Sequence, residues 1–306
     1  MRTRFRSDRG LTARMVVTVF LLGLVYVAFI AALVAVRAPW LLVLVVAAGF
    51  FLVQYFFSDR LALYAMHGRV VSPQEAPELH GIVDRLCALA DMPKPVVAIA
   101  DSDVPNAFAT GRNSKRAVVC ATTGLLRRLD REELEGVLAH ELSHVAHRDV
   151  AVMTVASFLG VVAGFITRMG LQFGMYGGFG GGRRDDRRDQ TAAVFLLVVL
   201  VSAVAYALSF LLIRALSRYR ELAADRAGAF LTGRPSTLAS ALTKVTGEMA
   251  RIPTRDLRAA EPFNAFFFTP AIARGFSLSS LFSTHPPLER RLDQLAHIAG
   301  ELGQPV

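Results

Sequence analysis

Four long apolar runs constrain what this chain can fold into. Residues 15–36 and 38–57 are uncharged and separated only by Arg37, and two further uncharged runs follow at 150–167 and 191–213. A helix needs about 20 mostly apolar residues to cross the ~30 Å hydrocarbon core of a bilayer. With 306 residues, 53% of them hydrophobic, and a mean hydropathy of +0.42, the chain is too apolar for a soluble globule. We therefore expect one domain together with four transmembrane helices.

The charges that flank these runs predict how the chain crosses the membrane. The N-terminal tail is rich in arginine, namely Arg2, Arg4, Arg6, Arg9 and Arg14, against a single Asp8. The positive-inside rule places this tail in the cytoplasm, and an even number of crossings returns the chain there. Both chain termini would then be cytoplasmic.

The crossings divide the chain into four segments. A tail and first hairpin occupy 1–57, and a second hairpin occupies 150–213, with a connector rich in Gly, Arg and Asp at 170–190. Segments 58–149 and 214–306 would face the cytoplasm and together build one domain outside the membrane. The sequence leaves open whether the second hairpin crosses the bilayer fully or only enters it.

The net charge of +9 raises the question of nucleic-acid binding. The arginines gather at the ends of the apolar runs, where they meet anionic lipid headgroups. We therefore expect these basic residues to bind the lipid bilayer, and we expect no nucleic acid as a partner.

The two cysteines carry no redox or metal signature. Cys87 and Cys120 do not form a C-x-x-C pair, and a cytoplasmic domain disfavours a disulfide. We expect both to be small buried hydrophobic residues.

A five-residue motif between the second and third apolar runs points to metal chemistry. Residues 140–144 read His-Glu-Leu-Ser-His. On a helix, His140 and His144 lie one turn apart on the same face, so both imidazoles can bind one metal ion. Glu141 is then adjacent to the metal without binding it. Because catalytic zinc lowers the pKa of water to about 7, a neighbouring carboxylate can take the proton of that water and pass it to a leaving amine.

Local patterns predict the elements around the motif. Asp130 followed by Glu133 is a capping box, which predicts that the helix carrying the motif begins there. A second capping box at 72–75 predicts a helix over 73–90. Short strands are expected at 96–100, 107–111 and 117–122. The expected fold class is α+β: a mostly helical zincin-type metallopeptidase domain with a small β-sheet.

A third metal ligand has to come from elsewhere, because catalytic zinc is usually held by three protein groups. The best candidate is Glu221, on a helical stretch that emerges from the fourth apolar run. His144 lies six residues before the third run and Glu221 eight residues after the fourth, so both stand about 10 Å from the membrane. Asp225, one turn further along, is placed to accept a hydrogen bond from a ligand histidine. His147 competes as a ligand, but three ligands on one straight helix would enclose the ion poorly.

Four motifs in the same order resemble one family. Residues 135–145 read E-G-V-L-A-H-E-L-S-H-V and 221–226 read E-L-A-A-D-R, while P-N-A-F-A-T-G stands at 105–111 and S-T-H-P-P-L-E-R-R at 283–291. Together they resemble the HtpX-type membrane zinc metallopeptidases, which are relatives of the CAAX prenyl endopeptidases. The resemblance covers most of residues 60–300.

The resemblance implies roles for individual residues. The zinc ligands would be His140, His144 and Glu221, with Glu141 as the base. Asn106 and His285 would contact the substrate backbone or the developing oxyanion, and Arg291 would support the site.

Local chemistry is compatible with the two substrate roles. Asn106 stands at the start of an expected strand, and peptidases commonly bind an extended substrate at a sheet edge. His285 precedes two prolines at an expected helix start, whose positive end disfavours imidazolium, so a neutral His285 would donate one hydrogen bond to an oxyanion. Turn and capping chemistry is the alternative for both residues.

We therefore expect an endopeptidase with one Zn²⁺ per chain, anchored in the cytoplasmic membrane, that cleaves membrane or misfolded proteins on the cytoplasmic side. Intramembrane proteolysis is disfavoured because the motif helix carries too many charges for hydrocarbon. A non-catalytic zinc-bound membrane scaffold is a second alternative. Glu141 argues against it, since a structural zinc site needs no base. A CAAX-type processing peptidase is a third alternative.

Overall fold

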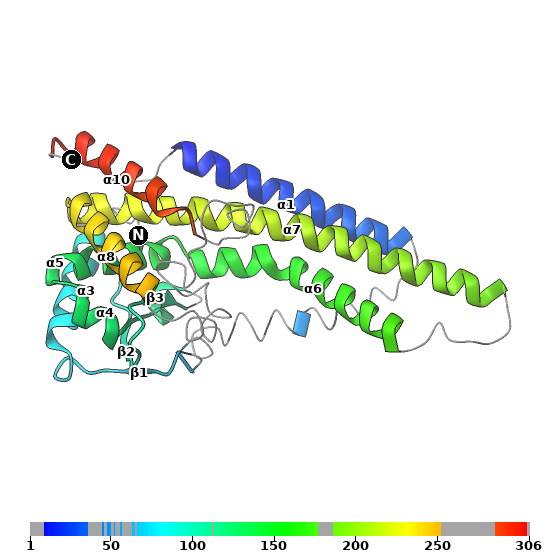
Figure 1. The fold of residues 1–306 in the computed structure, drawn as a ribbon, viewed down its shortest axis with the longest axis horizontal. Coiled ribbons are helices and arrows are strands. Elements are labelled where there is room, and N and C mark those ends of the chain that lie inside the picture. Colours follow the sequence, from blue (N-terminus) through cyan, green and yellow to red (C-terminus); the bar gives the residue numbers. More distant parts are fainter. Residues whose placement is uncertain are drawn as a thin grey trace. The chain divides into compact units, whose positions relative to one another are not determined.

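The computed structural model describes residues 9–35, 66–111, 113–176, 186–251 and 285–304, together with isolated residues between 45 and 64. The chain divides into two compact units, whose elements are labelled in Figure 1. Unit 1 comprises Met1–Met15, Tyr55–Val152 and Ser217–Val306, and unit 2 comprises Val16–Gln54 and Met153–Leu216.

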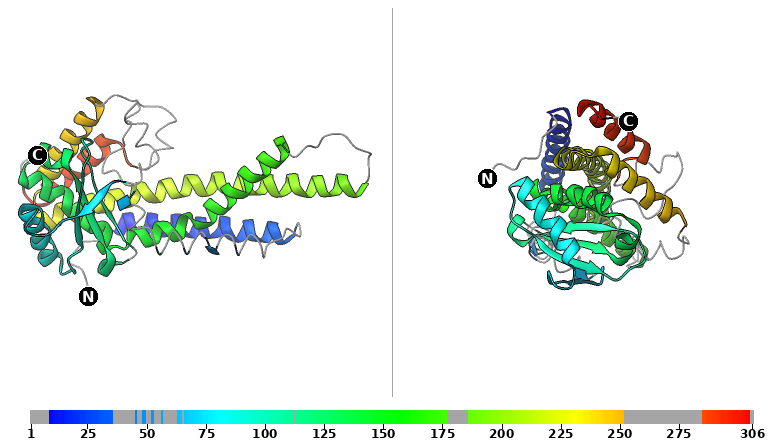
Figure 2. Two further views of the ribbon diagram at one scale, coloured as in Figure 1. Left: turned by 90° about the horizontal axis from the view of Figure 1, so that it is seen from below. Right: turned by 90° about the vertical axis from the view of Figure 1, so that its left-hand side faces the viewer.

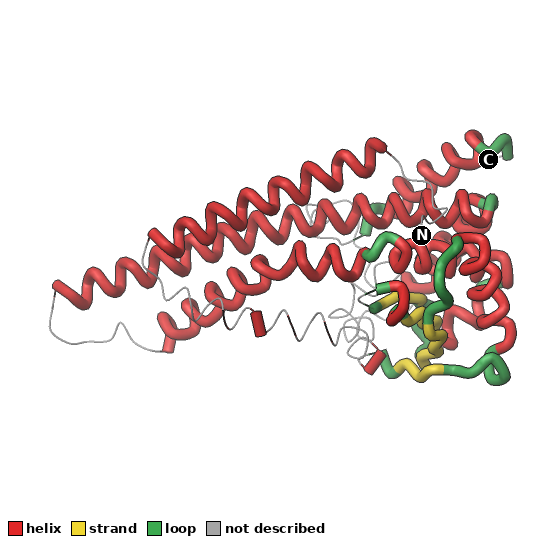
Figure 3. Tube along the Cα trace, turned by 180° about the vertical axis from the view of Figure 1, so that it is seen from behind, coloured by secondary structure: helices red, strands yellow, loops and turns green. Residues whose placement is uncertain are grey.

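Unit 1 contains a four-stranded mixed sheet with the strand order β1-β2-β4-β3. The strands are β1 (Gly68–Val70), β2 (Val96–Ala100), β3 (Ala107–Thr110) and β4 (Val118–Thr122), shown in yellow in Figure 3. β2 and β4 are parallel, whereas β1 pairs with β2 and β3 pairs with β4 in antiparallel fashion. β3 is therefore an edge strand of this sheet. The three predicted strands are confirmed, and β1 was missed because three residues are too few for a period-two pattern.

The two faces of the sheet have different cores. Inward residues of β2, β3 and β4 join the large core cluster that also contains the apolar residues of α3 (Pro77–Ala90) and α5 (Arg131–Ala146). The alternate residues, among them Phe108 and Cys120, form a smaller cluster on the opposite face, against which Leu63 and Met66 pack. Figure 2 shows the helices beside the sheet. This alternation places α5, which carries the metal-binding motif, directly against the sheet.

α3 begins later than predicted. Ser72 and Glu75 do make the two reciprocal bonds of a capping box, with the Ser72 backbone N–H donating to Glu75 Oε2 at 2.7 Å. However, the chain then forms a turn, and the helix starts at Pro77. The reason is Ala76, which precedes a proline and is therefore kept out of the helical region, at φ −138° and ψ 63°.

α5 begins where the sequence predicts. The Asp130 side chain accepts the Glu133 backbone N–H at 2.9 Å, and Glu133 accepts the Asp130 backbone N–H at 3.1 Å. The helix is buried on most sides, between the sheet, α3 and α8 (Pro235–Arg251). Unit 1 is completed by α4 (Thr123–Arg128), the short 3-10 helix η1 (Ser114–Arg116) and α10 (Leu288–Glu301).

Unit 2 is helical where the structure describes it. α1 (Arg9–Ala35), α6 (Asp149–Tyr176) and α7 (Asp186–Thr232) contribute residues to it, and they pack together through Phe29, Leu33, Ala163 and Ala205. Glycines on α6 allow this close approach, since a Cβ on Gly164 would lie 2.9 Å from the ring of Tyr206.

The four-span prediction is met in part. Within the described residues, two helices are long and apolar enough to cross a membrane, namely Arg9–Ala35 and Ala193–Thr232. The expected third span lies in α6, where the apolar stretch Ala156–Gln172 is shorter than the ~20 residues that a span needs. The expected span at 38–57 and much of the 170–190 connector lie outside the described residues.

The cysteines behave as expected. Both Cys87 and Cys120 are free and buried, at 5% and 0% exposure. Burial raises the pKa of the Cys87 thiol to about 11 and that of Cys120 to about 12. Both side chains are therefore protonated packing residues at neutral pH.

Candidate metal centre

α5 presents the two motif histidines one turn apart, as its periodicity predicts. The Nε2 atoms of His140 and His144 lie 3.2 Å from each other. His140 is 1% exposed, whereas the His144 side chain is 15% exposed. The two rings therefore meet at a site that is closed on the His140 side and more open at His144.

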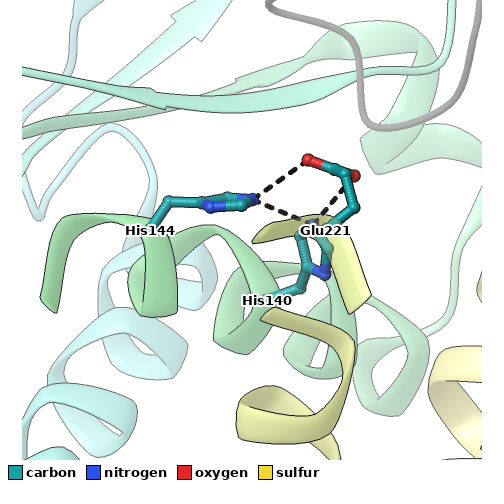
Figure 4. Close-up of side chains that lie close together, drawn as sticks. All are labelled: His140, His144 and Glu221. Carbon is teal, nitrogen blue, oxygen red and sulfur yellow. Dashed lines mark hydrogen bonds and ion pairs between the residues drawn. The ribbon is translucent and has the colours of Figure 1, made fainter. Parts of the chain in front are cut away.

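α7 adds a carboxylate to the same point. Oε2 of Glu221 lies 3.7 Å from Nε2 of His140, and its Oε1 lies 3.4 Å from Nε2 of His144. One ligand atom from each of the three residues lies within 4.8 Å of the others (Figure 4). Two imidazole nitrogens and one carboxylate oxygen are a donor set of catalytic zinc sites. The three residues present therefore fit a zinc ion.

A glycine lets the two helices approach closely enough for this meeting. A Cβ on Gly228 of α7 would lie 3.0 Å from the backbone nitrogen of His140 and 3.2 Å from its Cα. Such contacts are tighter than side chains normally make, so the α7 backbone lies against the α5 backbone only because residue 228 has no side chain. Gly228 lies seven residues after Glu221, which places both on the same face of α7.

His140 is held from behind by a carboxylate and an arginine. Its Nδ1 lies 2.9 Å from Oδ1 of Asp225. Arg291 of α10 then donates to both Asp225 oxygens, from Nε at 2.7 Å and from Nη2 at 2.6 Å. Asp225 and Arg291 are 0% and 2% exposed, so this bidentate pair is fully buried.

His144 has a similar partner that the sequence analysis missed. Its Nδ1 lies 2.6 Å from Oδ2 of Asp149, the first residue of α6. The other oxygen of Asp149 forms an ion pair with Arg220. A carboxylate five residues after a ligand histidine, just past the helix end, was the available signal.

His285 contacts the third ligand residue. Its Nδ1 lies 3.0 Å from Oε2 of Glu221. An ionised carboxylate can only accept, so Nδ1 must carry the proton, and a neutral ring then has an acceptor at Nε2. The oxyanion role of His285 stays a prediction.

Burial and charge set the protonation of these groups. Burial lowers the pKa of His140, which favours the neutral imidazole that a metal requires. Burial alone would raise the pKa of Glu221 and of Asp225. The charges of His285 and Arg291 outweigh it, so the pKa of Glu221 lies well below its usual range and that of Asp225 is lowered.

Glu141 has the opposite tendency. Burial raises the pKa of its carboxyl to about 8, because the side chain is 5% exposed and lies near the Glu221 carboxylate. A cation held between the three ligand atoms would act against that rise. The backbone N–H of Ala109 in β3 donates to Oε2 of Glu141 at 2.9 Å, which fixes the carboxylate and leaves Oε1 for other partners.

Asn106 lies at the start of β3 and is 0% exposed. Its backbone N–H donates to Thr122 Oγ1 and its carbonyl accepts the Thr122 N–H, both at 2.9 Å. These bonds join the start of β3 to the end of β4. They fit the structural alternative for this residue, and its substrate role stays a prediction.

Comparisons with known proteins identify the family to which this chain belongs. The model of peptidase family M48 matches residues 73–299, a span that includes every site residue above. The chain belongs to peptidase family M48. It is therefore a metalloendopeptidase, and with its long apolar helices we describe it as a membrane metallopeptidase.

Curated M48-type relatives match along almost the whole chain. "Protease HtpX homolog 1" of Streptomyces coelicolor is 66% identical over 304 residues, which is 99% of this chain and 98% of the relative. "Protease HtpX homolog" of Moorella thermoacetica is 55% identical over 302 residues, 99% of both chains. The resemblance to HtpX-type peptidases is thus confirmed.

A solved structure shares the fold. The crystal structure of S. mikatae Ste24p superposes with a TM-score of 0.52 and covers 96% of this chain and 68% of that one. At 16% identity this likeness concerns the fold alone.

Proposed function

We propose that this M48 peptidase is a zinc-dependent endopeptidase with one zinc ion per chain, bound by His140, His144 and Glu221. The observation that supports this most is the convergence of these three side chains from two helices, with ligand atoms within 4.8 Å of one another. When bound, zinc supplies a Lewis acid for the scissile carbonyl and the attacking water.

Glu141 moves the proton. Its Oε2 is engaged by the Ala109 N–H, so Oε1 is the atom that takes a proton from the attacking water and delivers it to the leaving amine. Burial raises the pKa of Glu141 and a bound cation would lower it, and the exchange requires a carboxyl that both accepts and releases a proton near the working pH. Burial of the side chain keeps bulk water from competing for that proton.

An extended substrate would add to the β3 edge of the sheet, beside the Ala109 N–H that Glu141 already occupies. The residues of β3 alternate, and Asn106, Phe108 and Thr110 bond toward β4, so Ala107 and Ala109 face away from it. Ala109 also holds Glu141, which ties the proposed substrate strand to the base. Such β-augmentation is a common way to hold a peptide in extended form. Asn106, which directly precedes β3, would contact the backbone of the substrate strand.

His285 would stabilise the oxyanion through its Nε2 edge. Its Nδ1 is engaged by Glu221, and the ring is 5% exposed, so its orientation is fixed before a substrate binds. A preoriented hydrogen-bond donor in a buried site stabilises negative charge that develops on the substrate. Asp225 would orient His140, and Arg291 would hold Asp225 in place.

The proposed setting is the cytoplasmic face of the cell membrane. The arginines of the N-terminal tail support a cytoplasmic start, and four crossings would keep both parts of the catalytic domain, 58–149 and 214–306, on that side. With the metal centre about 10 Å from the bilayer, membrane proteins and their cytoplasmic loops are the nearest substrates. A role in protein quality control follows from that choice of substrate.

The test is proteolysis of an unfolded, unrelated protein by the purified enzyme in detergent. We expect cleavage that a zinc chelator abolishes and added zinc restores. The variant Glu141→Gln should bind zinc like the parent, because residue 141 is not a ligand, yet lose activity by about 10²- to 10⁴-fold.

Two outcomes would oppose the proposal. Equal cleavage by Glu141→Gln would exclude Glu141 as the base. Bound zinc without chelator-sensitive proteolysis of any substrate would favour the scaffold alternative. A reporter fused within residues 170–190 would test the topology, with an external position expected.

A further inference from the structure

The turn between α5 and α6 places the Asp149 carboxylate next to the metal centre. α5 ends at Ala146, and Arg148 adopts a left-handed conformation with φ 57°, which residues with a side chain rarely adopt. α6 then begins at Asp149, whose Oδ2 lies 2.6 Å from Nδ1 of His144. An unfavourable backbone conformation thus accompanies the contact between Asp149 and His144, a combination that often marks a functional constraint.

Asp149 is in turn held by a cation. Its Oδ1 forms an ion pair with Arg220, and both side chains are nearly buried, at 11% and 9% exposure. Among the described residues, neither that oxygen nor Nη2 of Arg220 forms a regular hydrogen bond with any other group. The pair thus offsets part of the cost of burying two charges, and the Glu221 carboxylate also acts on Arg220. Arg220 is next to Glu221 in sequence, so the pair borders two ligand residues.

The two ligand histidines have matching supports. Behind His140 stand Asp225 and Arg291, and behind His144 stand Asp149 and Arg220. In each case the carboxylate faces Nδ1, which leaves Nε2 directed at the site. A carboxylate that accepts from one ring nitrogen fixes the tautomer and orientation of the ring and strengthens the other nitrogen as a ligand.

We propose that Asp149 and Arg220 are positioning residues for His144, which orient its ring and increase the zinc affinity of the centre. This inference rests on the proposed zinc site. A purely structural ion pair is the competing explanation, since an acidic residue at a helix start is favourable by itself. The two explanations predict different zinc affinities when Asp149 is substituted.

The experiment measures zinc affinity of the purified full-length chain by competition with a chromophoric chelator. Asp149→Ala should bind zinc about 10- to 100-fold more weakly than the parent. Asp149→Asn should also weaken it, and should change the visible absorption of the Co²⁺-substituted protein, which reports ligand geometry. Asp84→Asn is the matched control, because Asp84 is an exposed carboxylate paired with Lys94. It should leave both readouts unchanged.

A double variant separates positioning from folding. Asp149→Asn alone takes the Asp149 counter-charge from the buried Arg220, and Asp149→Asn with Arg220→Met removes the arginine charge as well. We expect the melting temperature of the zinc-free double variant to return toward the parent value while its zinc affinity stays low.

Three outcomes would refute the positioning role of Asp149 and Arg220. If Asp149→Ala and Asp149→Asn bind zinc within about two-fold of the parent with an unchanged Co²⁺ spectrum, the inference fails and the zinc site stands. If zinc affinity recovers together with stability in the double variant, the pair is structural and the inference fails. If the parent itself binds no zinc, the proposed function fails and takes this inference with it.

Discussion

Nδ1 of His285 lies 3.0 Å from Oε2 of Glu221, so the residue proposed for oxyanion binding is oriented by the residue proposed as third ligand. His285 lies in the segment just before α10 and Glu221 lies on α7, and both side chains are buried. One carboxylate thereby links metal binding to substrate activation. The function of His285 can be separated from metal binding by substitution.

His285→Ala should lower kcat by about 10²- to 10³-fold, the usual loss on removing an oxyanion donor. Zinc content at saturating zinc should stay at one ion per chain, because the three ligands are retained, although loss of the contact with Glu221 should weaken the zinc affinity. His297→Ala is the control, since His297 lies on α10, the helix that follows His285, with its side chain 80% exposed. A kcat within a few-fold of the parent would exclude His285 from the chemistry.

Arg291→Met should destabilise the protein by about 3–5 kcal/mol, because it leaves the buried Asp225 carboxylate without its counter-charge. Denaturant unfolding of the zinc-loaded protein in detergent measures this. The neighbouring Arg290 is exposed, so Arg290→Met should change stability by less than about 0.5 kcal/mol. Equal effects of the two substitutions would show that the bidentate pair does not add to the free energy of unfolding.

Gly228→Ala should weaken zinc binding and destabilise the protein by about 1–3 kcal/mol. The added methyl would stand 3.0 Å from the His140 backbone and push α7, with Glu221, away from α5. Gly247 is a helical glycine with nothing within 4 Å of the added Cβ, so Gly247→Ala should be neutral or stabilising by up to about 1 kcal/mol. Unchanged zinc affinity in Gly228→Ala would mean that helix spacing does not set the ligand distances.

The thiols should be unreactive until the chain unfolds. Burial raises the pKa of Cys87 to about 11 and of Cys120 to about 12, so at pH 8 both are protonated and shielded. Because the folded pKa values exceed the usual 9.0, the stability that the neutral thiols contribute is present below pH 9 and decreases as the pH rises toward 11. Alkylation at pH 8 with and without denaturant measures this. Rapid labelling of the folded protein would contradict it.

Much of the site could be predicted because its signals are local. The spacing of His140 and His144 is a property of one helix, and the capping box at Asp130 fixes where that helix begins. Glu221 required a long-range inference, and the apolar runs between the two motifs supplied it. The strands could be found because their residues alternate between two cores.

The rest depended on backbone geometry that a linear pattern does not encode. Asp149 was missed because its approach to His144 needs the left-handed Arg148, an unfavourable conformation for a residue with a side chain. The start of α3 was misplaced because Pro77 overrides the capping box at Ser72. The contact of His285 with Glu221 joins residues 64 positions apart and has no local sequence signal.

The central claim is that one metal ion is bound jointly by α5 and α7. The most direct measurement is the zinc content of the purified chain after dialysis against buffered zinc, for the parent and for Glu221→Ala. We predict one zinc per chain in the parent and a loss of most of it in Glu221→Ala, since the two remaining histidines hold the ion weakly. Full zinc occupancy in Glu221→Ala would contradict the account.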